Sequence, residues 1–212
     1  MIDQFFCVIT IGDKRGCSNT QMVTAEVSGN MPLYSLFSDM TNHWARTYVN
    51  DLAADEVVSG IDGKFAPDRE VTRAEAIKMI MYSFGKTNGV CDATVFPDLR
   101  SSDWFCSVAS LAKKDGFVDG SNGYLYPNRS ITRAEAIKIV IEVKGDIMAM
   151  VVLAPFTDVS KDAWYATYAA HAKKLGLVAG VDGKFLPNNN ITRAELAKII
   201  SVAKKLYEES LL

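Results

Sequence analysis

A four-residue motif, Thr-Arg-Ala-Glu, occurs three times in this chain at intervals of sixty residues, beginning at Thr72, Thr132 and Thr192. Other residues keep the same interval. They are the tryptophans Trp44, Trp104 and Trp164, the glycine pairs Gly60/Gly63, Gly120/Gly123 and Gly180/Gly183, and the prolines Pro67, Pro127 and Pro187. A fixed period of tens of residues is typical of repeat architectures. The sequence therefore predicts three similar units that account for most of the molecule.

The motif predicts the start of a helix in each unit. A threonine followed three residues later by a glutamate forms a capping box, in which each side chain bonds the backbone N–H of the other residue. The residues that follow have apolar side chains on one helical face. These are Ile77, Ile80, Met81 and Phe84 in unit one, Ile137, Val140 and Ile141 in unit two, and Leu196, Ile199, Ile200 and Ala203 in unit three. One two-helix unit cannot bury such a face alone, so we expect the three units to share a core.

An earlier helix is predicted in each unit, from about the tryptophan onward. In unit one, Trp44, Tyr48, Val49 and Leu52 fall on one face at the helical period of about 3.6 residues. Its candidate N-caps are Asn42, Asp103 and Asp162. Gly116 and Gly176 fit the left-handed position that ends a helix. Unit one has Glu56 at that place, so its first helix is expected to end differently.

The arginine of the motif is not explained by helix stability. At the first helical position its charge lies beside the positive end of the helix dipole, which is unfavourable. An arginine in all three copies therefore indicates a partner. The partner is either a carboxylate elsewhere in the fold, such as Asp39, Asp98 or Asp158, or an anionic ligand held jointly with the free N–H groups of the first helical turn.

In this order, the residues resemble the S-layer homology (SLH) domain, of which three in tandem is the usual set. The resemblance covers about Phe37 to Lys204. It rests on the three Thr-Arg-Ala-Glu motifs, the three tryptophans, the glycine segments such as Gly180 to Pro187, and the segments Phe37-Ser38-Asp39, Phe96-Pro97-Asp98 and Phe156-Thr157-Asp158. It implies a mainly α fold, in which the second helices form a central three-helix bundle within a pseudo-threefold, three-lobed body.

The resemblance also implies a function and a set of site residues. In that family, grooves between lobes bind a cell-wall polysaccharide that bears a pyruvate ketal, and the arginine of the motif meets its carboxylate. By position, the ligand-binding candidates are Arg73, Arg133 and Arg193, together with Asp39, Asp98 and Asp158. Trp44, Trp104 and Trp164 are interpreted either as core anchors, the commoner role, or as sugar-stacking rings. Gly60, Gly120 and Gly180 are expected to form turns first and to contact sugar second. Lys78, Lys138 and Lys198 are attributed to a solvated helix face.

The boundaries follow from the repeats: an N-terminal segment over residues 1–36, unit one over 37–95, unit two with its linker over 96–155, and unit three over 156–212. The first segment is β-prone, with a plausible hairpin from Phe5–Ile11 and Gln21–Val27. Asp3 and Gln4 argue against a secretory signal. We expect this segment to be the remnant of an upstream domain, in a chain that is the C-terminal part of a longer protein.

The four cysteines fall into two close pairs. One pair is Cys7 and Cys17, and the other is Cys91 and Cys106. An even count in close pairs favours disulfides formed in an oxidising compartment. Free thiols are the alternative. A zinc site is the weaker one, since no C-x-x-C spacing exists and the two histidines, His43 and His171, occupy non-equivalent repeat positions.

Composition excludes several classes of function. The net charge of −2 gives no electrostatic footprint for nucleic acid or an anionic membrane. The longest apolar run, Ile147–Pro155, is shorter than the roughly 18 residues that span a bilayer and is interpreted as a packed linker. No repeated nucleophile and base are present beyond the capping boxes, so we expect no enzyme activity, no cofactor and no metal.

Two functional hypotheses remain. The first is an extracellular anchor that binds a secondary cell-wall polysaccharide, or another polymer linked to peptidoglycan, and so holds a surface protein on the cell envelope. The second is a module that self-associates in a surface lattice. Under the first hypothesis, Arg133→Ala is expected to weaken polymer binding with little loss of fold stability, because Thr132 and Glu135 remain.

Overall fold

The computed structural model describes residues 35–146 and 155–212, all within one compact unit, Tyr34–Leu212. These residues form six α-helices and, apart from isolated bridges, no β-strands. The helices are α1 (Arg46–Ala54), α2 (Arg73–Ser83), α3 (Cys106–Lys114), α4 (Arg133–Lys144), α5 (Ala166–Lys174) and α6 (Arg193–Glu209), with a short 3-10 helix, η1, at Ser38–Met40. The mainly α fold with two helices in each repeat is confirmed. The expected N-terminal hairpin and residues 147–154 of the linker lie outside the described residues.

The three capping boxes form as predicted. Thr72 Oγ1 accepts a hydrogen bond from the Glu75 N–H at 3.3 Å, and Glu75 Oε2 accepts one from the Thr72 N–H at 3.0 Å. The same two bonds start α4 at 3.4 and 3.0 Å and α6 at 3.2 and 3.0 Å. The repeated motif therefore sets where α2, α4 and α6 begin.

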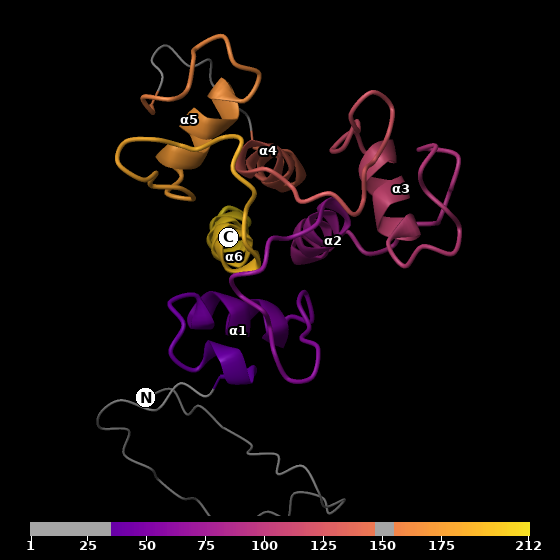
Figure 1. The fold of residues 1–212 in the computed structure, drawn as a ribbon, viewed down its shortest axis with the longest axis horizontal. Helices are drawn as coiled ribbons and strands as arrows, with labels where there is room; N and C mark the ends of the chain where they lie inside the picture. Colours follow the sequence, from indigo (N-terminus) through magenta and orange to yellow (C-terminus); the bar gives the residue numbers. More distant parts are fainter. Residues whose placement is uncertain (1–34, 147–154) are drawn as a thin grey trace, which may run out of the picture. The chain divides into compact units, whose positions relative to one another are not determined.

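Helices α2, α4 and α6 pack against one another, each in contact with the other two. Figure 1 views them nearly end-on, with α1, α3 and α5 outside them. Their predicted apolar faces are buried: Ile80, Val140 and Ile200 have no exposed surface. Burial of one such side chain is worth about 1.5–3 kcal/mol, so these contacts are the main stabilisation of the shared core.

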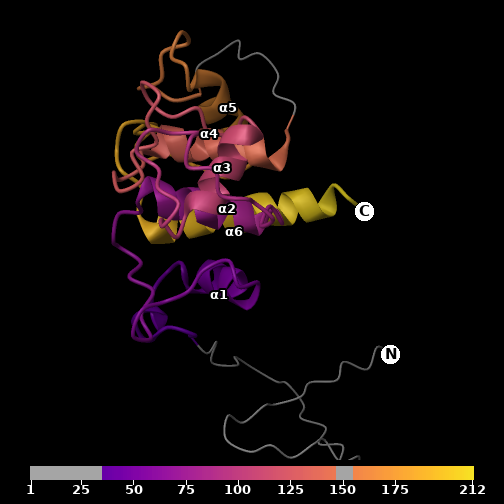
Figure 2. The same cartoon turned by 90° about the vertical axis from the view of Figure 1, so that its right-hand side faces the viewer.

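The outer helices pack across the repeat boundaries. Helix α3 of unit two contacts α2 of unit one, α5 of unit three contacts α4 of unit two, and α1 of unit one contacts α6 of unit three. Figure 2 shows the extended end of α6 running beyond the other helices. Each outer helix is therefore covered by the inner helix of another unit, and the first unit closes on the third.

A ring of backbone hydrogen bonds joins the three units just before the capping threonines. The Val71 N–H donates to the Ile191 carbonyl, the Ile131 N–H to the Val71 carbonyl, and the Ile191 N–H to the Ile131 carbonyl, each at 3.1 Å. All three residues are fully buried. These are backbone groups that would be costly to leave unpaired, so each unit depends on both of the others.

The first N–H groups of each inner helix are also bonded to another unit. The Arg73 N–H donates to the Arg129 carbonyl at 2.9 Å, and the Ala74 N–H donates to the Pro127 carbonyl at 3.0 Å. The starts of α4 and α6 make the equivalent bonds to residues 189 and 187 and to residues 69 and 67. The hypothesis that free first-turn N–H groups hold an anion is therefore wrong, because the neighbouring unit already occupies them.

The outer helices begin two residues after each tryptophan. Their N-cap residues, Ala45, Phe105 and Tyr165, make no side-chain capping bond, so the expectation of capping by Asn42, Asp103 and Asp162 is wrong. Asp103 instead accepts from the Arg100 N–H at 2.8 Å and closes the preceding turn.

The outer helices end alike in all three units. Gly116 and Gly176 take the predicted left-handed conformation, with φ of 81° and 71°. Glu56 takes it as well, with φ of 57°, although a side chain there costs about 1–2 kcal/mol. The expected difference in unit one is thus absent.

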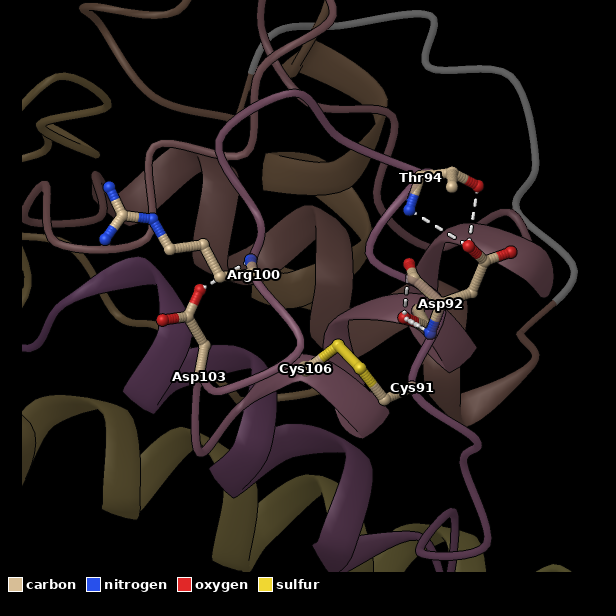
Figure 3. Close-up of a disulfide and its surroundings, with 7 residues drawn as sticks. Cys91, Asp92, Thr94, Arg100, Asp103 and Cys106 are labelled. Atoms are coloured by element: carbon tan, nitrogen blue, oxygen red, sulfur yellow. Dashed lines mark hydrogen bonds between the residues drawn. A yellow bond between two sulfur atoms is a disulfide. The ribbon is translucent and has the colours of Figure 1, made fainter.

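A disulfide links Cys91, in the segment after α2, to Cys106, the first residue of α3 (Figure 3). The segment is also held by Ser110, whose Oγ accepts from the Asp92 N–H at 2.9 Å. The predicted pairing of Cys91 with Cys106 is confirmed. It fastens the connection between units one and two to the outer helix of unit two.

The other predicted disulfide, between Cys7 and Cys17, is not confirmed. Both Cys7 and Cys17 lie in the N-terminal segment, outside the residues that the structure describes. The pairing of Cys7 with Cys17 therefore stays a prediction from their close spacing in the sequence.

Candidate functional site

Three grooves open between the units, and each is lined by residues of all three units. We name each groove after the unit that supplies its glycine loop. Groove 1 has a volume of about 450 Å³, groove 2 about 320 Å³ and groove 3 about 190 Å³. The sequence-predicted arginines and tryptophans lie in these grooves, although they are far apart in each repeat.

The grooves share a plan. One unit supplies the loop together with the motif glutamate and a lysine, the preceding unit supplies the motif arginine, and the following unit supplies the tryptophan. Groove 1 thus contains Glu75, Lys78, Arg193 and Trp104, groove 2 contains Glu135, Lys138, Arg73 and Trp164, and groove 3 contains Glu195, Lys198, Arg133 and Trp44.

The tryptophans are surface residues. Trp44, Trp104 and Trp164 are 56%, 62% and 57% exposed, so the interpretation as core anchors is wrong. Each ring is supported by the aromatic residue beside it in the chain. For Trp104 and Trp164 this is an edge-on contact with Phe105 and Tyr165, with ring centroids 5.1 and 5.3 Å apart. A large ring held in this way, with most of its surface in solvent, is a natural platform for a ligand.

The arginines of the motif pair with the glutamate of the next motif. Arg73 is buried; its Nε donates to the Leu125 carbonyl at 2.9 Å and its Nη1 lies 3.2 Å from Glu135 Oε1. Burial lowers the pKa of Arg73, although the Glu135 carboxylate acts to raise it. The expected internal partner was an aspartate, and the observed one is this glutamate.

Arg193 repeats this arrangement in groove 1. Its Nε donates to the Phe65 carbonyl at 3.0 Å, its Nη2 donates to the Ser59 carbonyl at 3.3 Å, and its Nη1 lies 3.8 Å from Glu75 Oε1. The guanidinium also lies over the Phe65 ring, 4.5 Å from its centroid. The arginine therefore ties the loop of one unit to the inner helix of another.

In grooves 1 and 2, the motif glutamate is also paired with a second arginine. Arg69 Nη2 donates to Glu75 Oε1 at 2.6 Å, and Arg129 Nη2 donates to Glu135 Oε1 at 2.7 Å. Burial acts to raise the pKa of both glutamates, but the arginines and the capping N–H groups lower it below the usual value. Both carboxylates are therefore held ionised.

Groove 3 departs from this pattern. Asn189 stands where the other units have Arg69 and Arg129, so Glu195 has no second arginine beside it in the chain. Arg133 Nη2 donates to Glu195 Oε1 at 2.7 Å, but the buried Arg133 Nε has no hydrogen-bond partner among the described residues. The three grooves are thus similar in plan and different in their polar contacts.

Asp39, Asp98 and Asp158 clamp the loops. Asp39 accepts from the N–H groups of Phe65 at 2.9 Å and Ala66 at 2.7 Å, and the other two aspartates make the same pair of bonds. Burial acts to raise the pKa of Asp39 and Asp158, but these backbone bonds lower it. Ala66 has φ of 57°, an unfavourable conformation that the clamp stabilises. The aspartates support the groove loops and do not line the grooves.

The loop glycines are required by close packing. A Cβ at Gly120 would lie 2.6 Å from the Tyr124 carbonyl oxygen and 2.9 Å from the Phe96 ring, and Gly120 also has φ of 82°. Gly60 and Gly180 are crowded by the corresponding carbonyl and ring. Gly120 and Gly180 line grooves 2 and 3. The glycines therefore form turns, as expected, and bring backbone to the groove wall.

Sequence reasoning missed the lysines. Lys78, Lys138 and Lys198 line the three grooves and do not simply cover a solvated helix face. Lys78 Nζ lies 5.8 Å from the centroid of the Trp104 ring. The signal that could have found them was their spacing of sixty residues, which matches that of the arginines.

Two other kinds of feature are absent from residues 35–146 and 155–212. No group of three or more His, Cys, Asp or Glu side chains gathers there as a metal site would require. Within the same ranges, no helix has both the length and the apolar character needed to cross a membrane.

A sequence model of the S-layer homology domain matches residues 36–77, 95–137 and 155–197, together more than half of the chain. The chain belongs to the S-layer homology domain family. Its three matched segments each include a Trp, a glycine loop and a Thr-Arg-Ala-Glu motif. The grooves described above are therefore formed between successive S-layer homology repeats.

Curated relatives include proteins with different names. An amylopullulanase of Thermoanaerobacterium thermosulfurigenes is 32% identical over 77% of this chain and 9% of its own length. Exoglucanase XynX of Acetivibrio thermocellus is 30% identical over 89% of this chain and 18% of its own length. S-layer protein EA1 of Bacillus anthracis is 26% identical over 91% of this chain and 23% of its own length. The chain thus spans less than a quarter of each of these relatives.

Proposed function

We propose that the chain is a non-catalytic anchoring module that holds a surface or S-layer protein on the cell envelope. It does so by binding an anionic, pyruvylated secondary cell-wall polysaccharide in the grooves between its repeats. The observation that carries this proposal is the pairing, in every groove, of a tryptophan more than half exposed with a lysine and an arginine. An aromatic face suits a pyranose ring, and cations beside it suit a carboxylate.

The relatives support a shared role in attachment. Those named as polysaccharide-degrading enzymes and those named as S-layer proteins have a segment like this chain in common, although their names differ in activity. Another relative is named a cell surface glycoprotein. A segment common to such different proteins fits an anchor better than a catalytic domain. The Cys91–Cys106 disulfide fits an extracellular location.

Within each groove the residues have different tasks under this proposal. The tryptophan stacks on the sugar, and the lysine is the cation that meets a carboxylate wherever the bound sugar carries one. The arginine is nearly buried and already paired, so it holds the glycine loop against the neighbouring helix. Its charge also adds to the positive electrostatic potential in the groove. The aspartates keep the loop in shape without touching the polymer.

The test is co-sedimentation of the folded chain with cell-wall sacculi, either intact or stripped of their attached polysaccharide. Wild type should sediment only with intact walls, and the triple variant Trp44→Ala/Trp104→Ala/Trp164→Ala should stay in solution. Val90→Ala is the matched control, because Val90 is 84% exposed and lines none of the three grooves.

Three results would contradict the proposal: sedimentation with stripped walls, sedimentation of the triple variant, or no sedimentation at all. Oligomers that form without any wall material would support the self-assembly module instead.

A further inference from the structure

The grooves share a plan but differ in charge. Groove 1 is lined by four cationic side chains, Lys64, Arg69, Lys78 and Arg193, against one carboxylate, Glu75, which is a formal excess of three positive charges. Groove 2 has Arg73 and Lys138 against Asp119 and Glu135 and is formally neutral. Groove 3 has Arg133 and Lys198 against Glu195, an excess of one.

The grooves also differ in the residue that follows each lysine by one helical turn, which is not itself counted among the lining residues. Lys138 is followed by Glu142, and Lys138 Nζ lies 2.7 Å from Glu142 Oε2, so its charge is neutralised within the helix. Lys78 is followed instead by Tyr82. Its Nζ lies 5.3 Å from the Tyr82 ring centroid and 5.8 Å from that of Trp104, in cation–π contact with both. The Lys78 ammonium group is therefore positioned by aromatic rings, which leaves its charge available to a ligand.

Part of the difference in lining charge lies in the loops. Position 59 is serine in unit one, and the equivalent residue 119 of unit two is an aspartate. Asp119 lines groove 2 with a side chain that is 73% exposed, and its carboxylate lies 3.7 Å from the ammonium group of Lys113, which does not line the groove. A like charge within a few ångströms opposes an anion by an amount that is largest in a partly desolvated groove.

The volumes of the grooves also distinguish groove 1 from the other two. Groove 1, at about 450 Å³, and groove 2, at about 320 Å³, lie within the roughly 300–1,000 Å³ typical of small-ligand sites. Groove 3, at about 190 Å³, lies below that range. Of these three grooves, groove 1 alone combines ample volume with a strong excess of positive charge.

We infer that the three grooves are specialised, and that groove 1 is the one that selects the carboxylate-bearing sugar of the polymer, with Lys78 and Trp104 as its recognition pair. This inference rests on the proposed function. Groove 2 then binds neutral sugar units, and groove 3 contributes little to affinity. A polymer that carries carboxylates on only some of its sugars is therefore bound by this chain in one alignment, with a carboxylate-bearing sugar in groove 1.

The experiment measures binding of two small probes by isothermal titration calorimetry: a methyl hexoside that carries a 4,6-pyruvate ketal, and the same methyl hexoside without the ketal. The variants are Lys78→Met, Lys138→Met and Lys198→Met, which keep the length of the side chain and remove its charge. Lys78→Met should weaken binding of the ketal probe by at least about tenfold and leave the neutral probe unchanged. The other two should change the affinity for the ketal probe by less than about twofold.

A reciprocal pair of variants tests the same inference without removing a lysine. Ser59→Asp places in groove 1 the residue that unit two already carries, so the loop should fold, and affinity for the ketal probe should fall. Asp119→Ser should raise the affinity of groove 2 for that probe, to less than that of groove 1, because Lys138 stays paired with Glu142. The thermal midpoint of each variant shows whether it is folded.

The outcomes separate the two proposals. A wild-type chain that binds neither probe nor intact walls overturns the proposed function. A chain that binds walls but loses the ketal probe equally in all three lysine variants, or most in Lys138→Met, overturns the specialisation of groove 1 alone. Binding to walls without measurable preference for the ketal probe overturns the carboxylate selectivity.

Discussion

The three helix starts are nearly identical, whereas the three grooves beside them differ in volume and charge. The capping bonds at Thr72, Thr132 and Thr192 agree within 0.2 Å, and the backbone ring between the units has the same length in all three bonds. The grooves, which begin a few residues away, range from about 190 to 450 Å³ and from neutral to strongly positive. Where three units meet, each must fit two others, so geometry is preserved. A groove has no such constraint, and its side chains can diverge.

The largest expected effect tests whether the motif arginines belong to the part of the structure that is alike in all three units. Arg73→Ala leaves the Leu125 carbonyl without its buried donor and removes one of the two arginines paired with Glu135, which keeps Arg129, so it should lower the free energy of unfolding by about 3–4 kcal/mol, measured by urea denaturation. Arg133→Ala should cost about half as much, because Arg133 already has an unpaired Nε and a more exposed side chain, even though its loss removes the arginine that pairs with Glu195. Arg133→Ala is thus not expected to leave the stability almost unchanged, as the sequence alone suggested. Equal losses at both positions would show that burial of the arginine is not what matters.

The next effect separates backbone conformation from close packing in a loop. Gly120 and Gly123 both have φ of 82°, but only Gly120 has neighbours within 3 Å of an added Cβ. Gly123→Ala should therefore cost about 1 kcal/mol for the left-handed conformation alone. Gly120→Ala should cost roughly 3 kcal/mol, since the Tyr124 backbone and the Phe96 ring must also move. If the two variants unfold at the same urea concentration, the loop has room that the structure does not show.

A smaller effect measures how alike the helix starts are. Each of Thr72→Ala, Thr132→Ala and Thr192→Ala removes one cap and should lower stability by about 1 kcal/mol. The three losses should agree within about 0.5 kcal/mol, because the capping bonds are alike. A spread much larger than this would mean that caps of the same geometry contribute unequally to the free energy of unfolding.

The smallest effect, taken per group, concerns pH. The pKa values of Glu75 and Glu135 are lower in the folded state than usual, so their contribution to stability is present at neutral pH. It should be lost as pH falls below about 4.3, the ordinary value for glutamate, and through the lowered folded value. The urea midpoint of wild type should decrease over that range, and Glu135→Gln should make the decrease shallower. A midpoint that rises on acidification would reverse the sign of this linkage.

Much of the scaffold could be predicted because its signals are local. Thr72 and Glu75 are three residues apart, so a capping box can be read from the sequence, and the apolar faces of α2, α4 and α6 follow from helical periodicity. The Cys91–Cys106 pairing is local in the same sense. The first-turn N–H groups were misjudged, because their partners at Pro127 and Arg129 belong to another unit and leave no mark beside them in the chain.

The site residues were harder to predict for the same reason. Trp104 looked like a core residue because it lies in phase with Val108 and Ala112, yet α3 begins after it and the ring faces a groove. Lys78 looked like a solvated residue because Trp104, which belongs to another unit, comes next to it only in the folded chain. Position along a repeat predicts which residues recur, but the side on which they lie depends on how the units close on one another.

That closure has a consequence for how such proteins can change in length. In an open solenoid every added repeat extends the stack, and the end repeats need special polar surfaces to cap it. Here the Val71, Ile131 and Ile191 backbone bonds form a circle, and α1 of the first repeat packs on α6 of the last. Every repeat has two neighbours and none is an end. Gain or loss of a single repeat would open the circle and expose its backbone groups, so the number of repeats is set by geometry and can change only by whole sets.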